Sequence, residues 1–358
     1  MTWIRAGRVG WRYAAALAVG FLLVAAAPAS AAGPWKPEAG KTRSGLTLSA
    51  VSCLSTGWCA AVGFKSLETQ GLASYVYAES GNGSVWTVAP SSGPTANKLA
   101  SVSCVASDWC QAVGYNVENF NALNEHWNGR AWTRIPSPVA KLGLDGVSCT
   151  SRQFCMAVGG SLIERWNGAK WTLVPSARQP GSVFTSVSCV SPTWCAAVGY
   201  YASTTSRVAA LVEEWNGKAW RVVPSPHPGS NWPGMLNAVD CVSPTWCMAG
   251  GSAEKGALIE HWNGRAWTIM GHPSGAAGKG VGAYVWGISC VSRTACVAVG
   301  YSVPLAERWN GNVWAPMSRL DGWGDEQAGD PEYFLGVSCI TATHCKAVGD
   351  GNAIATTG

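Results

Sequence analysis

The chain has 358 residues, of which 47% are hydrophobic and 13% are charged, and its formal net charge is +5 at pH 7. Removal of the N-terminal leader described next takes away three arginines and lowers this charge to +2. So small and scattered a positive charge does not make a nucleic-acid-binding surface, which excludes nucleic acid as the expected partner.

The first 31 residues have the three parts of a secretory signal peptide. Arg5, Arg8 and Arg12 form a positive region, an apolar run extends from Ala14 to Ala27, and Ala29-Ser30-Ala31 is a small-residue cleavage site. The apolar run is short for a membrane span, and no later stretch reaches the roughly 18 apolar residues that a spanning helix needs. We therefore expect a secreted or wall-associated protein without stable membrane insertion. An uncleaved membrane anchor is the alternative.

The 14 cysteines form seven pairs, each with five residues between its members, and none is left over. The pairs are Cys53 with Cys59, Cys104 with Cys110, Cys149 with Cys155, Cys189 with Cys195, Cys241 with Cys247, Cys290 with Cys296, and Cys339 with Cys345. Such a connection between adjacent antiparallel strands sets the flanking cysteines opposite each other, at disulfide distance. We therefore expect seven disulfides, because disulfides form and persist in exported proteins. Zinc is the disfavoured alternative, because each pair supplies two of the four ligands of a structural site.

The first cysteines of successive pairs are 40–52 residues apart, which is the period of β-propeller blades. Around each pair the sequence predicts four short strands, and an Asn-Gly pair such as Asn263-Gly264 marks the turn between the third and fourth, where both residues tolerate a positive φ. We predict an all-β, seven-bladed propeller of four-stranded antiparallel blades, in a single domain over residues 32–358. The predicted blades are 46–90, 99–137, 144–176, 184–226, 236–270, 284–318, and 334–358 together with 33–38.

The last of these blades is predicted to join the two ends of the chain. The seventh repeat stops at Thr356-Thr357-Gly358, before its fourth strand. Trp35 matches the tryptophan that opens each complete fourth strand, from Trp86 to Trp314. The N-terminal segment should therefore supply the outer strand of the last blade, a closure that removes a free sheet edge.

The repeats resemble the kelch repeat, in which a di-glycine ends the second strand, a Val-Glu-x-Tyr-Asp stretch forms the third, and a tryptophan opens the fourth. Gly250-Gly251 and Gly159-Gly160 match the di-glycine, and Leu258-Ile259-Glu260-His261-Trp262 matches the third strand with Trp in place of Tyr. The cysteine pairs, and the single glycine of most blades, depart from the kelch pattern. The resemblance implies the fold and no particular function, because kelch propellers include both oxidases and binding modules.

Glutamates recur near the end of the third strand. They are Glu79, Glu125, Glu164, Glu213, Glu260 and Glu307. A ring of carboxylates suggests catalysis. A residue repeated in six blades is better explained by architecture, and we expect it to accept hydrogen bonds between blades.

Function is expected where the repeats differ from one another. Three of the 21 tryptophans lie outside the leader and the repeated positions, and the repeat pattern assigns them to links between blades. The predicted ligand-binding residues are these three and their neighbours: Trp232, Trp286, Trp323, Asp321, Asp325, Tyr284 and Tyr333. The links should share the face opposite the disulfide hairpins, and aromatic rings beside carboxylates suit glycans. Packing of long links by large side chains is the alternative.

These features favour a secreted, non-catalytic, monomeric recognition propeller without a cofactor, which binds an extracellular or cell-wall glycan or a protein. The alternative is a glycoside hydrolase or sialidase-like enzyme that uses carboxylates of residues 321–332 as acid and base. A copper oxidase is disfavoured because every cysteine is paired. The same acidic segment is a weak calcium candidate, since its spacing fits no EF-hand loop.

Overall fold

The computed structural model of the chain describes residues 35–37, 46–66, 74–81, 86–88, 97–139, 141–177, 181–202, 208–226, 234–254, 256–270, 284–301, 305–317, 333–350 and 354–357. By its internal contacts the segment Ala31–Gly358 forms one compact unit. The predicted signal peptide, residues 1–31, lies outside the described residues. Within the described ranges, no helix is long and apolar enough to cross a membrane.

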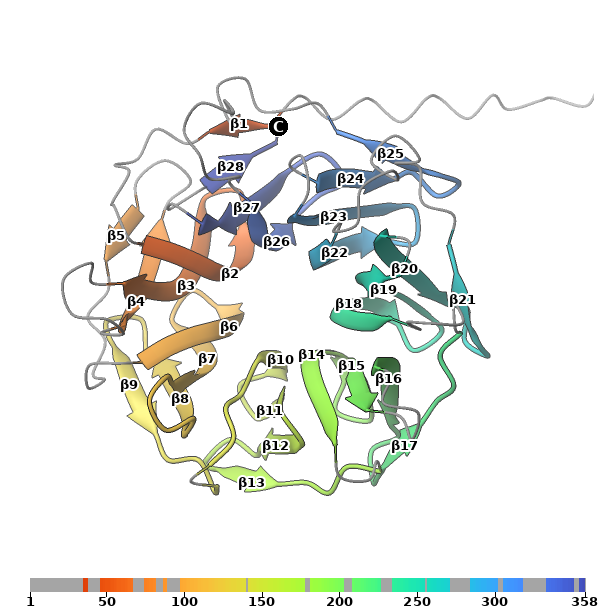
Figure 1. The fold of residues 1–358 in the computed structure, drawn as a ribbon. Coiled ribbons are helices and arrows are strands. Elements are labelled where there is room, and N and C mark those ends of the chain that lie inside the picture. The colour runs from red at the N-terminus through yellow and green to blue at the C-terminus, as the bar shows by residue number, and fades with distance from the viewer. Residues whose placement is uncertain are drawn as a thin grey trace, which may run out of the picture. The chain divides into compact units, whose positions relative to one another are not determined.

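Seven four-stranded antiparallel sheets follow one another around a central axis (Figure 1). Six of them are continuous segments, in which four consecutive strands pair in chain order. The seventh is composite, because it combines three strands from the C-terminal end with one from the N-terminal end. The first strand of each continuous sheet lies innermost and the fourth lies outermost (Figure 1).

The six continuous sheets have these strands. The first contains β2 (Leu46–Ser55), β3 (Trp58–Ser66), β4 (Ser74–Gly81) and β5 (Trp86–Val88). The second contains β6 (Asn97–Ala106), β7 (Trp109–Asn116), β8 (Ala122–Trp127) and β9 (Trp132–Ile135). The third contains β10 (Gly146–Ser151), β11 (Phe154–Gly159), β12 (Leu162–Trp166) and β13 (Trp171–Leu173). The fourth contains β14 (Ser182–Ser191), β15 (Trp194–Ala202), β16 (Val208–Trp215) and β17 (Trp220–Val222). The fifth contains β18 (Met235–Ser243), β19 (Trp246–Ala253), β20 (Gly256–Trp262) and β21 (Trp267–Ile269). The sixth contains β22 (Tyr284–Ser292), β23 (Ala295–Tyr301), β24 (Leu305–Trp309) and β25 (Trp314–Pro316).

The seventh sheet closes the ring. It contains β26 (Phe334–Cys339), β27 (Cys345–Gly349), β28 (Ile354–Thr356) and β1 (Lys36–Pro37). Lys36 pairs with Thr356 and Pro37 with Ala355, so the repeat that breaks off at the C-terminus is completed from the N-terminal side. The indole of Trp35 is buried, with its ring centre 5.7 Å from that of Phe334. A two-residue strand is thus held mainly by the side chain that precedes it.

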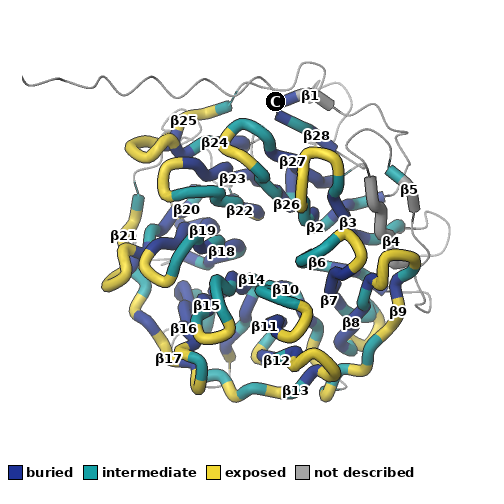
Figure 2. Tube along the Cα trace, turned by 180° about the vertical axis from the view of Figure 1, so that it is seen from behind, coloured by how far each residue is buried: buried dark blue, intermediate teal, exposed yellow. Residues whose placement is uncertain are grey.

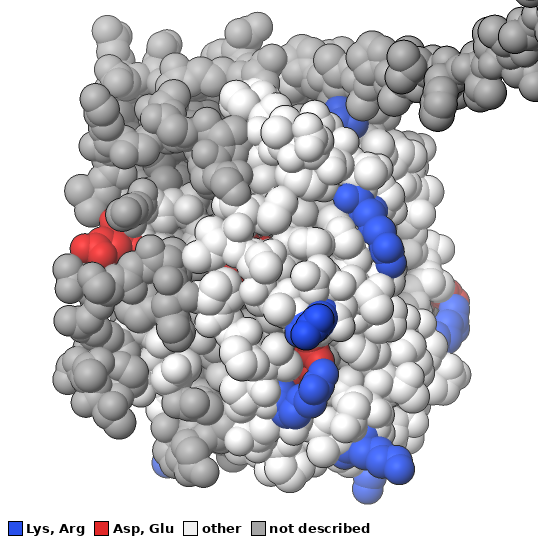
Figure 3. All heavy atoms as spheres, turned by 90° about the vertical axis from the view of Figure 1, so that its right-hand side faces the viewer, with Lys and Arg blue, Asp and Glu red and all other residues white. Residues whose placement is uncertain are grey.

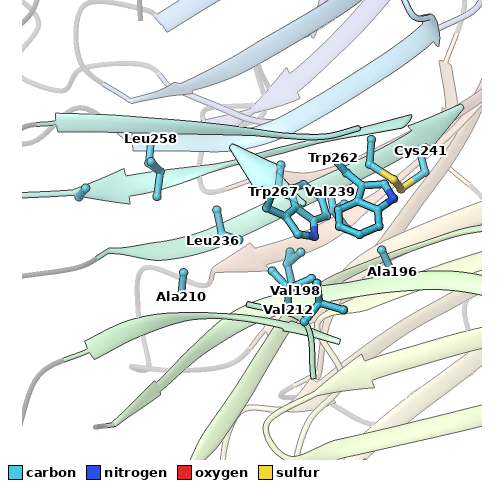
Figure 4. Close-up of a cluster of buried hydrophobic side chains, with 14 residues drawn as sticks. Ala196, Val198, Ala210, Val212, Leu236, Val239, Cys241, Leu258, Trp262 and Trp267 are labelled. Atoms are coloured by element: carbon cyan, nitrogen blue, oxygen red, sulfur yellow. A yellow bond between two sulfur atoms is a disulfide. The ribbon is translucent and has the colours of Figure 1, made fainter. Parts of the chain in front are cut away.

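Apolar side chains fill the space between neighbouring sheets. Where their burial is described, the second and third strands are mostly buried on both faces, because each sheet packs between two others, whereas exposed residues gather at the hairpin turns (Figure 2). Figure 4 shows one such interface, between the fourth and fifth sheets. Its residues include Ala196, Val198 and Val212 on one side and Leu236, Val239, Trp262 and Trp267 on the other. The core is therefore distributed over the interfaces rather than gathered at one centre.

All seven predicted disulfides are present, each joining the first two strands of a sheet with the two Cα atoms 4.0 Å apart. The bonded pairs are Cys53 with Cys59, Cys104 with Cys110, Cys149 with Cys155, Cys189 with Cys195, Cys241 with Cys247, Cys290 with Cys296, and Cys339 with Cys345. No described cysteine is free, so the alternative of zinc held by cysteine pairs is wrong.

The third strand is locked to the same hairpin as the disulfide. The indole N–H of its last residue donates to a hairpin carbonyl, as from Trp166 to Arg152 at 3.0 Å. These hairpins and the turns between third and fourth strands lie at one end of the sheets, termed the disulfide face. The links between sheets and the loops between second and third strands lie at the other end, termed the link face.

The Asn-Gly turns differ from the prediction. In each described turn four residues separate two paired tryptophans, as between Trp127 and Trp132, and a backbone hydrogen bond from the first of the four to the last closes the loop. Only the glycine has a positive φ, 89° at Gly129. The asparagine side chain instead accepts hydrogen bonds from the next backbone N–H groups, as Asn128 does from Arg130 and Ala131. This local bonding holds the loop shape, and so the asparagine needs no positive φ.

A ring of hydrogen bonds joins each sheet to the next. The backbone N–H of the first cysteine in each sheet donates to the side chain of the residue that precedes the first cysteine of the previous sheet, over 2.7–3.1 Å. Six acceptors are serines, and Ser338 closes the ring by accepting from Cys53. The seventh acceptor is Asp240, which accepts from Cys290 and from Cys241.

The closure predicts a large effect of a terminal side chain. Trp35→Ala should lower the free energy of unfolding by roughly 3–5 kcal/mol, because it empties a buried indole site. Trp314→Ala, which changes the equivalent buried residue of the sixth sheet, is the matched control and should cost a similar amount. Urea unfolding followed by tryptophan fluorescence measures both. A loss below about 1 kcal/mol for Trp35→Ala alone would show that β1 is not part of the cooperative ring.

Candidate functional site

Each inner strand departs from regular pairing four residues before its first cysteine. In six strands a β-bulge leaves one residue unpaired at this point, and in the third sheet the position falls just before β10. The residues, termed the bulge ring, are Ser49, Ala100, Asp145, Thr185, Asn237, Trp286 and Leu335. Because the inner strands run toward the disulfide hairpins, the bulge ring lies toward the link face.

Glycine opposite the bulge makes this geometry possible. A Cβ on the facing glycine of the second strand would lie only 1.8–2.3 Å from a backbone carbonyl oxygen of the first strand or of the segment that leads into it. Any larger residue there would force the two strands apart. The glycines concerned are Gly63, Gly114, Gly159, Gly199, Gly251, Gly300 and Gly349. These repeated glycines are therefore part of the scaffold.

The bulge ring is where the symmetry of the repeats breaks. Its seven positions hold seven different residue types, whereas the next two residues of each strand are small residues followed by Val or Ile. Together these residues line a central cavity of about 170 Å³. That volume is below the roughly 300 Å³ at which small-molecule pockets begin. Recognition is therefore expected on the rim of the cavity rather than inside it.

One side of the rim is aromatic. Trp286 stacks on Tyr284, with ring centres 5.7 Å apart and planes at 17°, and 37% of Trp286 is exposed. Tyr284 lies 6.4 Å from Tyr301, which in turn packs edge-on against Tyr333 at 5.8 Å. These four residues, termed the aromatic arc, extend across the sixth and seventh sheets. They offer a continuous run of ring surface with an exposed tryptophan at the cavity.

Another side of the rim is charged. The Lys98 ammonium lies over the rings of Phe64 and Tyr115, at 4.9 and 5.7 Å from their centres. Burial lowers the pKa of Lys98, and the neighbouring Asp145 partly opposes this effect. Burial raises the pKa of Asp145 to about 6, despite the favourable influence of Lys98 and of the Gly160 N–H. Cation, carboxylate and rings thus meet at the first three sheets.

Two exposed residues beside this charged side have left-handed backbones. Phe120 has φ 56° and Leu142 has φ 97°, and the N–H of Leu142 donates to the carbonyl of Phe120 at 3.0 Å. Phe120 stacks on Tyr115 and is 59% exposed. Such conformations are costly for residues other than glycine and cluster at functional sites. They extend the non-repeating surface outward from the rim.

The structure brings three of the seven predicted ligand-binding residues together. Tyr284, Trp286 and Tyr333 lie in the aromatic arc, and Trp232, Trp323, Asp321 and Asp325 lie outside the described residues. The assignment of Trp286 to a link is wrong, because this residue is the third of β22. Sequence reasoning missed Lys98, Asp145 and Tyr301. Counting four residues back from the first cysteine of each pair would have located the bulge ring, including Asp145.

The repeated glutamates lie between sheets, as expected. In the described part of the chain, five of them are at most 1% exposed, among them Glu164, Glu213 and Glu260. Serines in the links donate to these three carboxylates, as Ser225 does to both oxygens of Glu260 at 2.9 and 3.0 Å. Burial raises the pKa of Glu260 to about 8, opposed by Ser225. They therefore contribute to the packing of neighbouring sheets.

Metal binding at the predicted calcium segment, residues 321–332, falls outside the described residues. Among the residues that are described, no cluster of three or more His, Cys, Asp or Glu side chains is arranged to hold a metal ion.

Comparison with known proteins identifies the fold. No family model matches the chain, and no curated protein matches its sequence. Among solved structures, YCF48 bound to D1 peptide has a TM-score of 0.61 at 14% identity, with 90% of this chain and 96% of that chain covered. The WD40 repeats of RRP9 give 0.62 at 9% identity, with 91% and 98% covered. The GH74 xyloglucanase from Xanthomonas campestris gives 0.59 at 15%, with 90% and 53% covered. The chain has a β-propeller fold, and the kelch resemblance stays a prediction.

Buried carboxylates predict a stability that falls as pH rises. Glu260 has an ordinary pKa of 4.5 that burial raises to about 8, and Asp240 has one of 3.8 that burial raises to about 6. Between the ordinary and the raised pKa values, the folded state therefore holds protons that the unfolded chain has released. The stabilisation is fully present below the ordinary pKa values and is lost as the pH rises through the raised pKa values of the folded state. The free energy of unfolding should decrease by on the order of 2–4 kcal/mol from about pH 5 to about pH 8.

The variant Glu260→Gln tests this dependence. It keeps an oxygen for Ser225 and removes the proton, so the decrease with pH should become distinctly smaller in urea titrations across that range. Glu254→Gln, at an exposed residue, is the control and should leave the slope unchanged. An unchanged slope for Glu260→Gln, or stability that rises with pH, would contradict the assignment.

Proposed function

We propose that this protein is a secreted, non-catalytic recognition propeller that binds an extracellular glycan at the link-face rim of its central cavity. The observation that carries the proposal is the bulge ring, where a symmetric scaffold presents seven different side chains. Trp286 is its one large ring, and this ring is exposed and stacked on Tyr284. Aromatic faces stack on the apolar faces of sugars, while neighbouring polar groups hold the hydroxyls.

Several features support extracellular binding rather than catalysis. Seven disulfides favour an oxidising compartment. Two described carboxylates toward the link face have a partner on the scaffold, since Asp350, which follows β27, accepts from Thr47 at 2.7 Å and Asp145 lies near Lys98. Propellers of similar fold include YCF48, whose structure contains a D1 peptide. That likeness makes a protein segment the second ligand class to test at the same rim.

Substitution of Trp286 tests the site. Trp286→Ala should weaken retention of the mature protein on its glycan about tenfold, because it removes one stacking surface. The ligand is first found by screening insoluble polysaccharides and a glycan array. Leu54→Ala is the matched control, because Leu54 has a similar exposure of 38% but lies on the disulfide face. It should leave retention and thermal unfolding unchanged.

Four results would overturn or change the proposal. Retention that survives Trp286→Ala would remove the site, and equal losses in both variants would point to the fold rather than the rim. Turnover of chromogenic glycosides by the mature protein would replace the binding function by an enzymatic one. Binding of exported proteins in place of glycans, lost in Trp286→Ala, would keep the site and change its ligand class.

A further inference from the structure

Folding separates the charges of this chain in a way that its net charge conceals. In the described sheets, Glu125, Glu164, Glu213, Glu260 and Glu307 are at most 1% exposed, and Glu214 is 2% exposed. Six of the twelve acidic side chains whose burial is described are thus almost fully enclosed. On the side of the molecule shown in Figure 3, Lys and Arg side chains are prominent at the described surface, and Asp and Glu are few. The surface is therefore more positive than the sequence total indicates.

The positive charge gathers on the disulfide face. Within the described ranges, the hairpins and turns of this face carry one acidic residue, Asp108, against six basic ones. The basic residues are Arg130, Arg152, Lys170, Lys218, Arg265 and Arg293, and all six are exposed. Two of them brace neighbouring hairpins, since Arg152 pairs with Asp108 at 2.5 Å and Arg293 donates to Ser243 and Thr245. The other four are free to bind something else.

These four residues, termed the basic arc, occupy the turns of four consecutive sheets. Arg130, Lys170, Lys218 and Arg265 follow β8, β12, β16 and β20, and their side chains have no hydrogen bond or ion pair with any described residue. The outer strands β9, β13, β17 and β21, which begin just after these turns, follow one another along the edge of the ring (Figure 1). The equivalent turn of the sixth sheet carries the neutral Asn312. The charge is therefore restricted to one part of the ring.

The turns hold these charges in fixed places. In each, the asparagine side chain accepts two backbone N–H groups, and the glycine has a φ of 89° or 94°. The loops are thereby set by local bonding and by the tryptophan pair at their base. Separated cations on rigid turns suit a ligand that carries many anionic groups along a flexible chain. Such a chain can contact several cations at once and release a counterion at each contact.

We propose that the basic arc is a second binding site, which holds an extracellular polyanion with repeated phosphate or carboxylate groups. Arginine binds such groups through paired N–H donors and lysine through a point charge. The site lies on the face opposite the bulge ring, so it is independent of the glycan site. A propeller with both sites attaches to an anionic polymer through one face and presents the other for recognition.

Affinity and its salt dependence test this site. The probes are inorganic polyphosphate and polygalacturonate. Each is titrated against the mature protein at NaCl concentrations from about 25 to about 200 mM. The variant combines Arg130→Asn, Lys170→Ala, Lys218→Asn and Arg265→Asn. Each replacing residue already occurs at the same position of another turn of this face. Affinity at low salt should fall by about 100-fold or more, and the slope of log K against log salt should lose most of its value. The probe that binds more tightly shows whether the site prefers phosphate or carboxylate groups.

Three further variants separate the site from general electrostatics. Lys218→Asn with Arg265→Asn should weaken binding far more than Lys65→Asn with Lys141→Asn, which removes the same charge from the link face. Asn312→Arg extends the arc by one sheet and should strengthen binding, with a slope steeper by about one. Trp286→Ala should leave polyanion binding unchanged.

Other results would overturn the proposal. Equal losses from the two double variants would reduce it to an effect of net charge. Binding to phosphatidylglycerol vesicles or double-stranded DNA, without binding to either polymer, would assign the arc to a membrane or nucleic acid. Failure of all probes would remove the site and leave the glycan proposal untouched.

Discussion

The hydrogen bond from each first cysteine to the previous sheet is the constraint on which this fold depends. It joins a backbone N–H beside a disulfide to a side chain beside the neighbouring disulfide, and it recurs at every junction, including the one between Ser338 and Cys53. Inner strands are thereby held in a common register around the cavity. Asp240 is the single carboxylate in this series, and it places a proton-sensitive group at one junction.

A common register has a functional consequence, because it aligns one irregularity in every strand. The bulge falls at the same height in successive sheets, and its residue points toward the axis without a partner in the ladder. Away from the bulge, equivalent positions of the sheets repeat the same cysteines, tryptophans, glycines and glutamates. Variation is tolerated at the bulge and in the turns of the disulfide face. The two proposed sites, the rim and the basic arc, are the places where side chains differ while the backbone repeats.

Local and periodic features could be predicted from the sequence. Cysteines six positions apart, such as Cys53 and Cys59, define their own hairpins, and the match of Trp35 with Trp314 located the pairing of the chain ends. Trp286 was assigned to a link because the prediction counted tryptophans rather than offsets from Cys290. The role of Lys98 could not be predicted, because its neighbours Phe64 and Asp145 are 34 and 47 positions away in the chain. The basic arc could not be predicted either, because the burial of the glutamates depends on packing between sheets.

Hydrogen exchange at the first-cysteine amides tests the central claim most directly. If the ring of hydrogen bonds constrains every junction, the amides of Cys53, Cys104, Cys149, Cys189, Cys241, Cys290 and Cys339 should all exchange at rates near that of global unfolding. Cys53 is the decisive member, because its acceptor Ser338 lies across the closure. Protection of Cys53 equal to that of Cys189 would support a closed, cooperative ring. Rapid exchange at Cys53 with slow exchange at the other six would contradict it.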